Sequence, residues 1–378
     1  MLSEMKTVAI WKRKLLPGTE TFIRNQQDAY SRYRAIAIAS QRHDSPLARE
    51  SDILLHESGN LSDRIKAKIL SAFGYSKELS QLLEQKSVDV VHAHFASEAF
   101  AVQEICKKLR IPLVVTFHGH DIHTAPEMPG WRGKRYKLRL KSLFKNGQHF
   151  IAVSEAIRER AILLGCPPEK ITVEYTGIPE TSLLRKDDRA DYDILFVGRL
   201  IPYKGTLHML KAASIAEEKL GKKLKLAVIG TGPELENLIN ISRQLNLSVD
   251  FLGHQSSSKV QGYLANSKIF CAPSMKVNKT VIEGFGMVYL EAALQETPVV
   301  AYAFSGVKEA VAHNETGILV EEGKVDLLAD ALIRLLRNPE FARQLGINGR
   351  QRVLKDFSVM NCIQSIENIY DRLIIDKI

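Results

Sequence analysis

The 378-residue sequence has no run of apolar residues near the 18 or so that a membrane-spanning helix needs. Its start, residues 1–6, leads directly into an apolar strand pattern rather than a signal peptide, so we expect a cytoplasmic protein. The cysteines are few and far apart, at Cys106, Cys166, Cys271 and Cys362. With no Cys-x-x-Cys pair they indicate neither a disulfide framework nor a thiolate zinc site, and we expect four reduced, buried side chains.

Several catalytic motifs are also missing. A Ser–His–Asp hydrolase needs a Gly-x-Ser-x-Gly turn, and the sequence has none. The first expected strand is not followed by a complete Gly-x-Gly-x-x-Gly, so no dinucleotide site is indicated. His118, His120 and His123 suggest a metal site, but Asp121 comes one position too early for the dinuclear His-x-His-x-Asp-His pattern. No other Asp or Glu set has zinc spacing, so we expect no metal.

Positive charge is in excess, with a net charge of +9. Residues 1–180 contain 27 Lys and Arg against 20 Asp and Glu, whereas the remainder contains 25 against 23. The amino-terminal half is therefore expected to face an anionic partner. Because the sequence has no zinc-finger spacing, no aromatic RNA-stacking pattern and no basic tail, we expect no nucleic acid. A membrane surface or a phosphorylated substrate fits the charge better.

Short apolar runs alternate with helical patterns along the chain. In the first half, strands are expected at residues 7–11, 35–39, 53–55, 88–95, 112–118, 150–154 and 171–175. Helical patterns lie between them, from residue 21, at 97–109, at 131–150 and from 155, with a basic amphipathic stretch at 64–83. In the second half, strands are expected at 193–198, 224–230, 249–253, 268–273, 298–302 and 317–320, and helices at 205–220, 233–245, 256–265 and beyond 324. Continuous apolar runs of this kind predict strands buried on both faces of parallel sheets, and hence an α/β protein.

The length and one break in this alternation predict the domains. A polar, charge-rich segment at residues 177–193 is the expected linker. We therefore place one domain at 1–180 and a second at 181–357, each large enough to bury a core. The final helix, within 358–378, is expected to pack back on the first domain.

A strongly basic helical stretch lies at residues 131–145, where Lys and Arg alternate with Trp131, Leu138 and other apolar side chains. The ordinary interpretation is a solvated charged face above a packed apolar face. The alternative is a helix that docks on an anionic lipid surface. The sequence leaves both open.

Two segments of the chain have the residue types that bind a nucleotide sugar. Gly198-Arg199-Leu200-Ile201-Pro202-Tyr203-Lys204-Gly205 follows an expected buried strand and opens a helix. Two cations at a strand end, beside a glycine that allows close approach, suit a diphosphate, although surface Arg and Lys are common. In the first domain, His118 follows an apolar strand and is expected at the ligand-binding edge of the sheet, as a hydrogen-bond donor.

The second segment, Glu283–Leu294, contains two carboxylates separated by two glycines and a helix start. If the helix begins near Gly286, the amides of Gly286, Met287 and Val288 are free to bind a phosphate. Glu291 then lies about 7 to 8 Å along the helix, at a distance that suits a ribose. Glu283 lies on the other side of the phosphate, where a transferred sugar would be.

These motifs resemble those of the retaining GT-B glycosyltransferases of family 4. The resemblance rests on Gly-Arg-Leu-x-x-x-Lys-Gly at 198–205 and Glu-Gly-Phe-Gly-x-x-x-x-Glu at 283–291, and extends to 17–22, 92–95, 118–121 and 153–155 in the first domain. It implies two Rossmann-like domains with a cleft between them and a C-terminal helix that crosses back to the first. The first domain would then be the acceptor side, and the second would bind the donor. Within the family, the pattern is most similar to transferases that build bacterial exopolysaccharide or lipid-linked repeat units.

The resemblance also implies roles for individual residues. Arg199 and Lys204 would hold the donor diphosphate, Glu291 the ribose, and Glu283 and His118 the transferred sugar. Gly18 would lie near the phosphates and the acceptor, with Glu20 and Asp121 on the acceptor side. Tyr203 stands where an acidic residue is common in the family, and residues 280–282 are unusually apolar.

The activity implied is retaining transfer of a hexose-type sugar from a nucleotide-diphosphate sugar to a glycan or lipid-linked acceptor, without a metal, in cell-surface polysaccharide assembly. Preorganised cations and helix amides stabilise the departing diphosphate. Two other classes remain: another nucleotide-sugar enzyme of this architecture, such as an epimerase or a phosphorylase-like enzyme, and a catalytically silent binding scaffold. The nucleotide base, the sugar and the linkage stay open.

Overall fold

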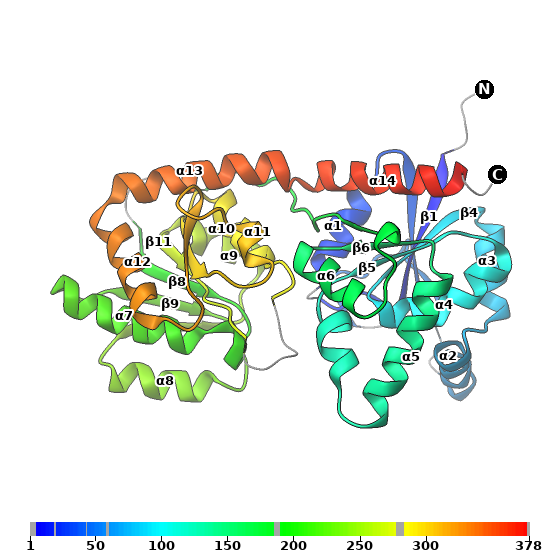
Figure 1. Ribbon diagram of the computed structural model, residues 1–378, viewed down its shortest axis with the longest axis horizontal. Coiled ribbons are helices and arrows are strands. Elements are labelled where there is room, and N and C mark those ends of the chain that lie inside the picture. The colour runs from blue at the N-terminus through cyan, green and yellow to red at the C-terminus, as the bar shows by residue number, and fades with distance from the viewer. Residues whose placement is uncertain are drawn as a thin grey trace. The chain divides into compact units, whose positions relative to one another are not determined.

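The computed structural model describes residues 5–18, 20–42, 44–57, 60–184, 190–276 and 283–375. The chain forms two compact units, the first made of Met1–Pro179 with Val359–Ile378 and the second of Glu180–Ser358. Each unit contains one sheet with helices on both faces (Figure 1). Within the described ranges, no helix is both long enough and apolar enough to cross a bilayer.

The first unit contains seven strands in the order β3-β2-β1-β4-β5-β6-β7. They are β1 (Lys6–Lys14), β2 (Tyr33–Gln41), β3 (Ile53–His56), β4 (Val88–His94), β5 (Leu113–Phe117), β6 (His149–Ala152) and β7 (Ile171–Val173). Its helices are α1 (Thr21–Ala29), α2 (Leu61–Phe73), α3 (Lys77–Gln85), α4 (Ala96–Leu109), α5 (Trp131–Asn146), α6 (Glu155–Leu163) and α14 (Val359–Ile375). Every strand pair is parallel.

The second unit contains six strands in the order β10-β9-β8-β11-β12-β13, again all parallel. They are β8 (Tyr192–Val197), β9 (Lys225–Ile229), β10 (Ser248–Gly253), β11 (Ser267–Cys271), β12 (Val299–Tyr302) and β13 (Gly317–Val320). Its helices are α7 (Thr206–Leu220), α8 (Leu235–Gln244), α9 (Ser257–Ala265), α10 (Met287–Leu294), α11 (Val307–Ala310), α12 (Val325–Arg337) and α13 (Pro339–Asp356). The sequence-based prediction of two parallel α/β sheets is confirmed.

The strand order of each sheet contains a reversal that fixes where ligands bind. In the first sheet, successive strands run outward from β1 in one direction and from β4 in the other, and in the second sheet β8 and β11 do the same. Loops that leave adjacent strands at such a switch point separate to opposite faces and leave a crevice at the carboxyl ends. The expected site residues lie after these strands, because Arg199 and Lys204 follow β8 and Glu283 follows β11.

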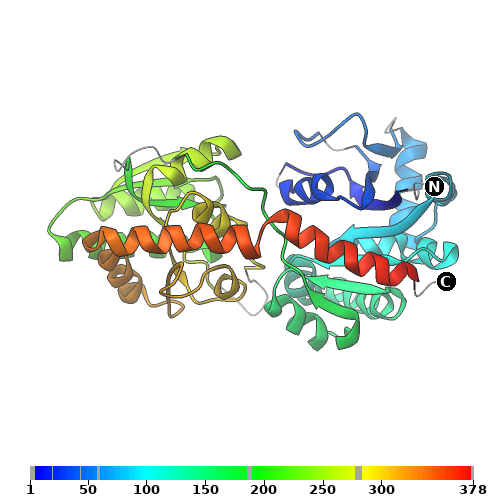
Figure 2. The ribbon, with the colours of Figure 1, turned by 90° about the horizontal axis from the view of Figure 1, so that it is seen from above.

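The C-terminal helix α14 packs on the core of the first unit (Figure 2). Its apolar side chains Ile363, Ile366 and Tyr370 are buried with residues of β1, β4 and α1. Glu367 is fully buried and accepts hydrogen bonds from the backbone amides of Ser31, at 2.8 Å, and Arg32, at 2.7 Å. Because the carboxylate binds the turn after α1, it fixes α14 to one position along that turn.

Two elements differ from the sequence-based prediction. The amphipathic stretch at 64–83 is two helices, because Gly74 ends α2 with a left-handed backbone at φ +64°. The helical pattern expected over 131–150 ends at Asn146, and β6 begins at His149. The four cysteines are buried and unpaired, as predicted.

Candidate functional site

The loop after β8 is held tightly against the end of β11. Gly205 has φ +74°, and a Cβ atom there would lie 2.0 Å from the carbonyl oxygen of Pro273, so only glycine allows this approach. The amide of Met275 donates to the carbonyl oxygen of Tyr203 at 2.8 Å. These contacts bring Lys204, at the end of the loop, beside the segment that follows β11.

Lys204 and Glu283 form an ion pair at this point. Nζ of Lys204 donates to Oε2 of Glu283 at 2.5 Å, and the hydroxyl of Ser274 donates to the same oxygen at 3.0 Å. The side chains are 16% and 12% exposed, so the pair is largely shielded but open on one side. The sequence placed these residues at different parts of a donor. The structure shows them in direct contact, and Ser274 is a partner that the sequence did not reveal.

Arg199 occupies the outer part of the same loop. Its side chain is exposed, and its guanidinium donates to the hydroxyl of Tyr203 at 2.8 Å. Leu200 between them is fully buried, and its amide donates to the carbonyl oxygen of Thr231 at 2.9 Å. The buried leucine anchors the loop, while the two polar side chains face outward. Tyr203, which departs from the family pattern, therefore orients Arg199.

Helix α10 begins at Met287 with Gly286 as its N-cap residue, as the sequence predicts for a start near Gly286. Gly286 has φ +86°, and a Cβ atom there would lie 2.4 Å from the ring of Tyr289, so a larger residue would displace that buried ring. No side chain caps this terminus in the described chain. The amides of Met287 and Val288 lie in the first turn, where a helix has no internal acceptor. This end of α10 can therefore bind an anion. Residues 280–282 lie outside the described residues.

Glu291 lies in the middle of α10 and is partly buried. Its carboxylate has no hydrogen-bond or ion-pair partner among the residues that the structure describes, and burial raises its pKa above the ordinary value. A carboxylate that is partly dehydrated and unbonded gains most from a ligand that donates hydrogen bonds. Two neighbouring hydroxyl groups, as on a ribose, are such a ligand.

In the first unit, His118 lies directly after β5 and belongs to a stack of three histidines. Its Nε2 lies 3.1 Å from Nδ1 of His94, and the His94 ring stacks on His92 with centroids 4.4 Å apart. The ring of Phe95 lies against His118, with centroids 4.6 Å apart. Burial lowers the pKa of His118 well below its usual value, and the nearby Lys12 lowers it further. His118 is therefore neutral at pH 7 and can donate a hydrogen bond without carrying charge.

Asp121 holds His118 in place. It is 2% exposed, and its two oxygens accept hydrogen bonds from the amides of Ala96, His118 and Gly119 at 3.0 to 3.1 Å. Burial raises the pKa of this carboxyl, while the three amide bonds lower it. Asp121 therefore joins the end of β5 to the start of α4, and its place on the acceptor side stays a prediction.

A second ion pair lies near the histidines. Nζ of Lys12, at the end of β1, lies 2.8 Å from the carboxylate of Glu20 and 4.7 Å from the ring centroid of Phe95. Both side chains are mostly buried. The sequence did not single out Lys12, because only tertiary packing brings it against Phe95. Gly18 lies in the turn between these residues, and a Cβ atom there would make only ordinary contact with Pro46.

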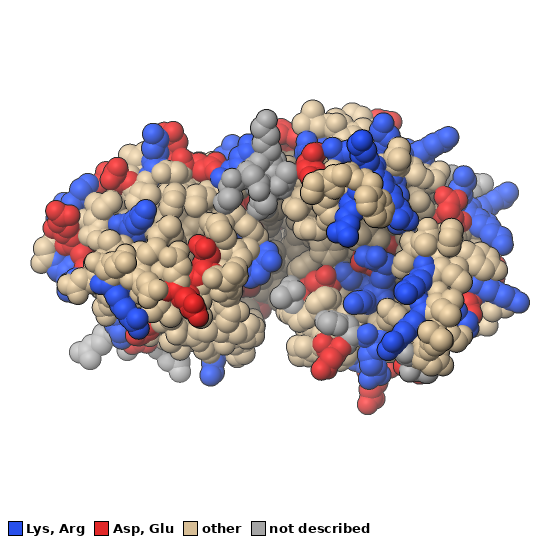
Figure 3. All heavy atoms as spheres, turned by 90° about the horizontal axis from the view of Figure 1, so that it is seen from below, with Lys and Arg blue, Asp and Glu red and all other residues tan. Residues whose placement is uncertain are grey.

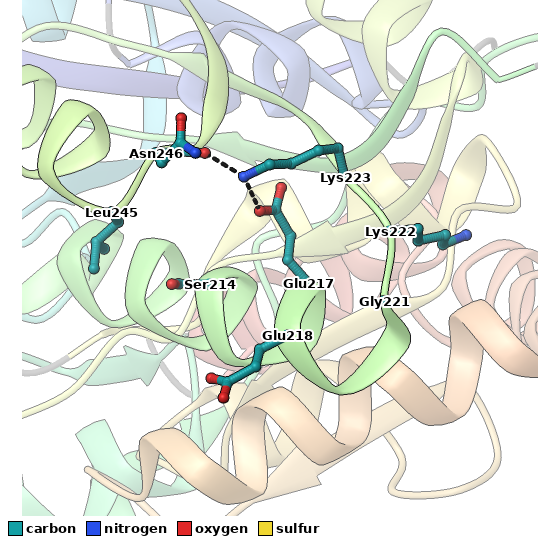
Figure 4. Close-up of a pocket in the computed structure, with 8 residues that line it drawn as sticks. All are labelled: Ser214, Glu217, Glu218, Gly221, Lys222, Lys223, Leu245 and Asn246. Atoms are coloured by element: carbon teal, nitrogen blue, oxygen red, sulfur yellow. Dashed lines mark hydrogen bonds and ion pairs between the residues drawn. The ribbon is translucent and has the colours of Figure 1, made fainter.

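No three His, Cys, Asp or Glu side chains of the described ranges converge in a way that could hold a metal ion. A surface pocket of about 400 Å³ lies at the end of α7 (Figure 4). There, Nζ of Lys223 donates to Glu217 at 2.8 Å and to the carbonyl oxygen of Asn246 at 2.5 Å. These polar groups bind one another and hold the helix end, so the pocket has a local structural role.

Comparison with known proteins gives consistent matches over both units. The family description "Glycosyltransferase Family 4" matches residues 18–181, and "Glycosyl transferases group 1" matches residues 184–352. The putative colanic acid biosynthesis glycosyltransferase WcaL of Salmonella typhimurium is 26% identical, over 93% of this chain and 86% of that protein. An uncharacterized glycosyltransferase of Methanocaldococcus jannaschii is 26% identical, over 85% of this chain and 86% of that protein.

A crystal structure of HepE from Anabaena in complex with UDP-glucose has the same fold, with a TM-score of 0.75 and 19% identity. The alignment covers 97% of this chain and 99% of that one. The two family matches, at residues 18–181 and 184–352, together span nearly the whole chain. The chain therefore belongs to the GT-B glycosyltransferases of family 4.

Proposed function

We propose that this protein is a retaining, metal-independent hexosyltransferase that uses a nucleotide-diphosphate sugar in cell-surface polysaccharide assembly. The acceptor is a glycan or a lipid-linked glycan. The observation that carries the proposal is the Lys204–Glu283 pair at the switch point of the second sheet, together with the uncapped first turn of α10 and the unbonded Glu291. Family membership, the UDP-glucose bound to HepE and the similarity to WcaL, a putative colanic acid biosynthesis glycosyltransferase, support it.

The second unit supplies positive charge where the leaving group needs it. Cleavage of the bond between the sugar and the diphosphate leaves negative charge on the phosphate oxygens. Lys204, Arg199 and the amides of Met287 and Val288 would stabilise that charge, and Glu291 would hold the ribose hydroxyls. Since these groups are already oriented by Glu283 and Tyr203, little reorganisation is needed when the bond breaks.

Retention of configuration would proceed on one face of the sugar with help from the leaving group. A double-displacement mechanism needs a free carboxylate as nucleophile. Among the described carboxylates near the two switch points, Glu283 is bound to Lys204 and Ser274, Glu20 is bound to Lys12, and Asp121 accepts three amide bonds. Glu291 has no such partner, but in this proposal it holds the ribose rather than the transferred sugar. Neutral His118 would instead donate a hydrogen bond to a hydroxyl of the transferred sugar. Isolation of a glycosyl adduct on Glu283 would contradict this mechanism.

The two alternative classes predict different outcomes. An epimerase would change the nucleotide sugar without any acceptor, whereas a transferase produces a new glycoside. A catalytically silent scaffold does not need a partly exposed Lys204–Glu283 ion pair or an uncapped start of α10, and the described site contains both.

The first test is a thermal-shift screen with UDP-, GDP- and ADP-sugars, since a ligand that binds the folded state raises the melting temperature. We expect one nucleotide to raise it, with a smaller rise in Glu291→Ala. The matching sugar nucleotide should then give an α-linked product from an α-linked donor, as read by NMR, with unchanged rate in EDTA. The proposal fails if no nucleotide sugar binds, and its stereochemical part fails if the product is inverted.

The enzyme would act as a peripheral protein at an anionic membrane surface on the cytoplasmic side, where lipid-linked acceptors are held. The supporting feature is the excess of Lys and Arg in the first unit, including those of residues 131–145.

A further inference from the structure

The histidine stack of the first unit is uncharged, although Lys and Arg gather on the surface of the same unit (Figure 3). His92 and His94 belong to β4, and His118 follows β5. The ring centroids of His92 and His94 are 4.4 Å apart, and those of His94 and His118 are 5.3 Å apart. Burial lowers the pKa of all three side chains, to about 3 for His92, so each ring is neutral near neutral pH.

The hydrogen bond between His94 and His118 determines where their protons lie. A neutral imidazole has one N–H donor and one bare nitrogen. Nδ1 of His94 lies 3.1 Å from Nε2 of His118, and neither ring has another hydrogen-bond partner among the residues that the structure describes. The charged groups nearby are bonded elsewhere, Lys12 to Glu20 and Asp121 to three backbone amides. One of the two histidines must therefore be the donor, and the other the acceptor.

Two arrangements of the protons satisfy this bond. In the first, Nδ1–H of His94 donates to Nε2 of His118, which then carries its own proton on Nδ1. In the second, Nε2–H of His118 donates, and His94 carries its proton on Nε2. Because His94 is 1% exposed and has no described acceptor for that proton, the second arrangement leaves a buried donor unpaired. The first places the unpaired N–H on His118, whose side chain is partly exposed, and is therefore favoured.

His92 holds the ring of His94 from the other side. Nδ1 of His92 lies 2.5 Å from the hydroxyl of Tyr370, and its Nε2 lies 2.7 Å from the hydroxyl of Thr116. Tyr370 belongs to α14, and its hydroxyl lies 2.7 Å from that of Tyr30. Since a rotation of the His92 ring would break one of these bonds, His92 forms a fixed surface on which His94 stacks, with the two rings 22° from parallel.

The ring of His118 is restricted on its remaining sides. The centroids of Phe22 and Phe95 lie 4.8 Å and 4.6 Å from that of His118. The backbone amide of His118 donates to Asp121, and its Nε2 is bonded to His94. Nδ1 is therefore the ring nitrogen that remains for a ligand.

We infer that His94 is a positioning residue that keeps the proton of His118 on Nδ1, so that His118 meets the transferred sugar as a hydrogen-bond donor. This deepens the proposed function, on which it rests, because it identifies the atom of His118 that contacts the sugar and the residue that fixes its proton. It also gives the C-terminal helix a part in the site, through the contact of Tyr370 with His92.

The first test reads the position of the proton directly. ¹⁵N NMR of the full chain, labelled at its histidines, distinguishes a protonated ring nitrogen from a bare one, and His118→Asn identifies the signals of His118. In the free protein near neutral pH, we expect a protonated Nδ1 and a bare Nε2. A proton on Nε2, or an exchanging mixture of the two forms, would overturn the inference.

Two substitutions of similar size at His94 test the direction of the bond. Asn places an amide N–H near the position of Nδ1, whereas ionised Asp places only acceptor oxygens there. His94→Asn should keep the proton of His118 on Nδ1 and lower kcat/KM by no more than about threefold. His94→Asp should move the proton to Nε2 and lower kcat/KM roughly 10-fold, because His118 no longer donates to the sugar. The added carboxylate should also raise the pKa of His118 and move the acidic limb of the kcat/KM profile to higher pH.

The matched control is His149→Asn. His149 of β6 is another mostly buried histidine of the first unit, and its Nε2 lies 3.0 Å from the hydroxyl of Thr172, outside the histidine stack. This variant should leave the NMR signals of His118 and kcat/KM unchanged, even where it lowers the melting temperature. Equal losses of kcat/KM in His94→Asn, His94→Asp and His149→Asn would show an effect of packing alone and overturn the inference.

Failure of this inference is distinguishable from failure of the proposed function. The NMR measurement needs neither donor nor acceptor, so it locates the proton whether or not the protein transfers a sugar. A protein that transfers a sugar with the proton of His118 on Nε2 contradicts the inference alone. A protein that has this proton on Nδ1 but binds no nucleotide sugar contradicts the proposed function, and with it the sugar contact of His118.

Discussion

The contact between Lys204 and Glu283 predicts a coupled loss of stability and activity when the lysine is removed. At 2.5 Å and an effective dielectric constant of about 20, the attraction is about 7 kcal/mol, most of which offsets dehydration of the two charges. Removal of one partner of a buried pair costs about 3–5 kcal/mol, because the other charge stays buried. Both side chains keep some exposure, at 16% and 12%, so we expect about 3 kcal/mol for Lys204→Met.

The assay combines calorimetry with initial rates. A loss of about 3 kcal/mol lowers the melting temperature of a unit of this size by roughly 6–12 °C. The double variant Lys204→Met/Glu283→Gln should recover most of this loss, because no unpaired charge remains. Turnover should fall roughly 10²- to 10³-fold in both variants, the range found when one preorganised group that stabilises transition-state charge is removed.

Two results would refute this reasoning. If the double variant is as unstable as Lys204→Met, the pair is not the source of the stability loss. If Lys204→Met keeps near-normal turnover with the preferred donor, Lys204 does not stabilise the leaving group. Ser274→Ala is a useful companion, because it removes only the second hydrogen bond to Glu283 and should have a smaller effect on both measurements.

Three further predictions concern other charged groups. Burial raises the pKa of Glu291, so the ionised carboxylate destabilises the free protein as pH rises through that pKa. Glu291→Gln should therefore raise the melting temperature near about pH 8 but not near about pH 4. It should also weaken nucleotide binding about 10-fold or more. Burial and, to a lesser extent, Lys12 lower the pKa of His118, so Lys12→Met should move the acidic limb of the pH profile of kcat/KM to higher pH. Identical profiles in the variant and the parent would disprove the link. Glu367→Ala should lower the free energy of unfolding, measured by denaturant titration, by about 3–5 kcal/mol, because two backbone amides and Arg32 lose a buried partner. Substitution of the exposed Gln364 by Ala should have little effect.

The sequence was sufficient for most of the fold because its strands are buried on both faces. Residues Val114, Val115 and Phe117 of β5 are all fully buried, which is the pattern that a continuous apolar run predicts. The break at Gly74 was missed because the helical pattern resumes after only a few residues. The strand order could not be predicted from periodicity, since it depends on which strands pair across long stretches of chain.

The site was predicted in its residue types but not in its contacts. Lys204 was found because it follows an apolar strand and precedes a glycine, and Glu283 was found because it precedes two glycines and a helix start. Their contact depends on the pairing of β8 with β11, which joins residues 79 positions apart. For Asp121, the family motif indicated the acceptor side, and the structure adds that its buried carboxylate accepts a hydrogen bond from the amide of His118, a contact that the sequence alone could not reveal.

The two sheets have the same topology at their switch points but opposite electrostatics. After β8 and β11, two cations and an uncapped helix end face outward, and the carboxylate beside them is held by Lys204. In the first unit, the Lys12–Glu20 ion pair is mostly buried, and His118 after β5 is neutral because its pKa is lowered. One topology can therefore present either exposed cations or a neutral buried ring, because the residues after the strands, rather than the sheets, determine where charge is exposed.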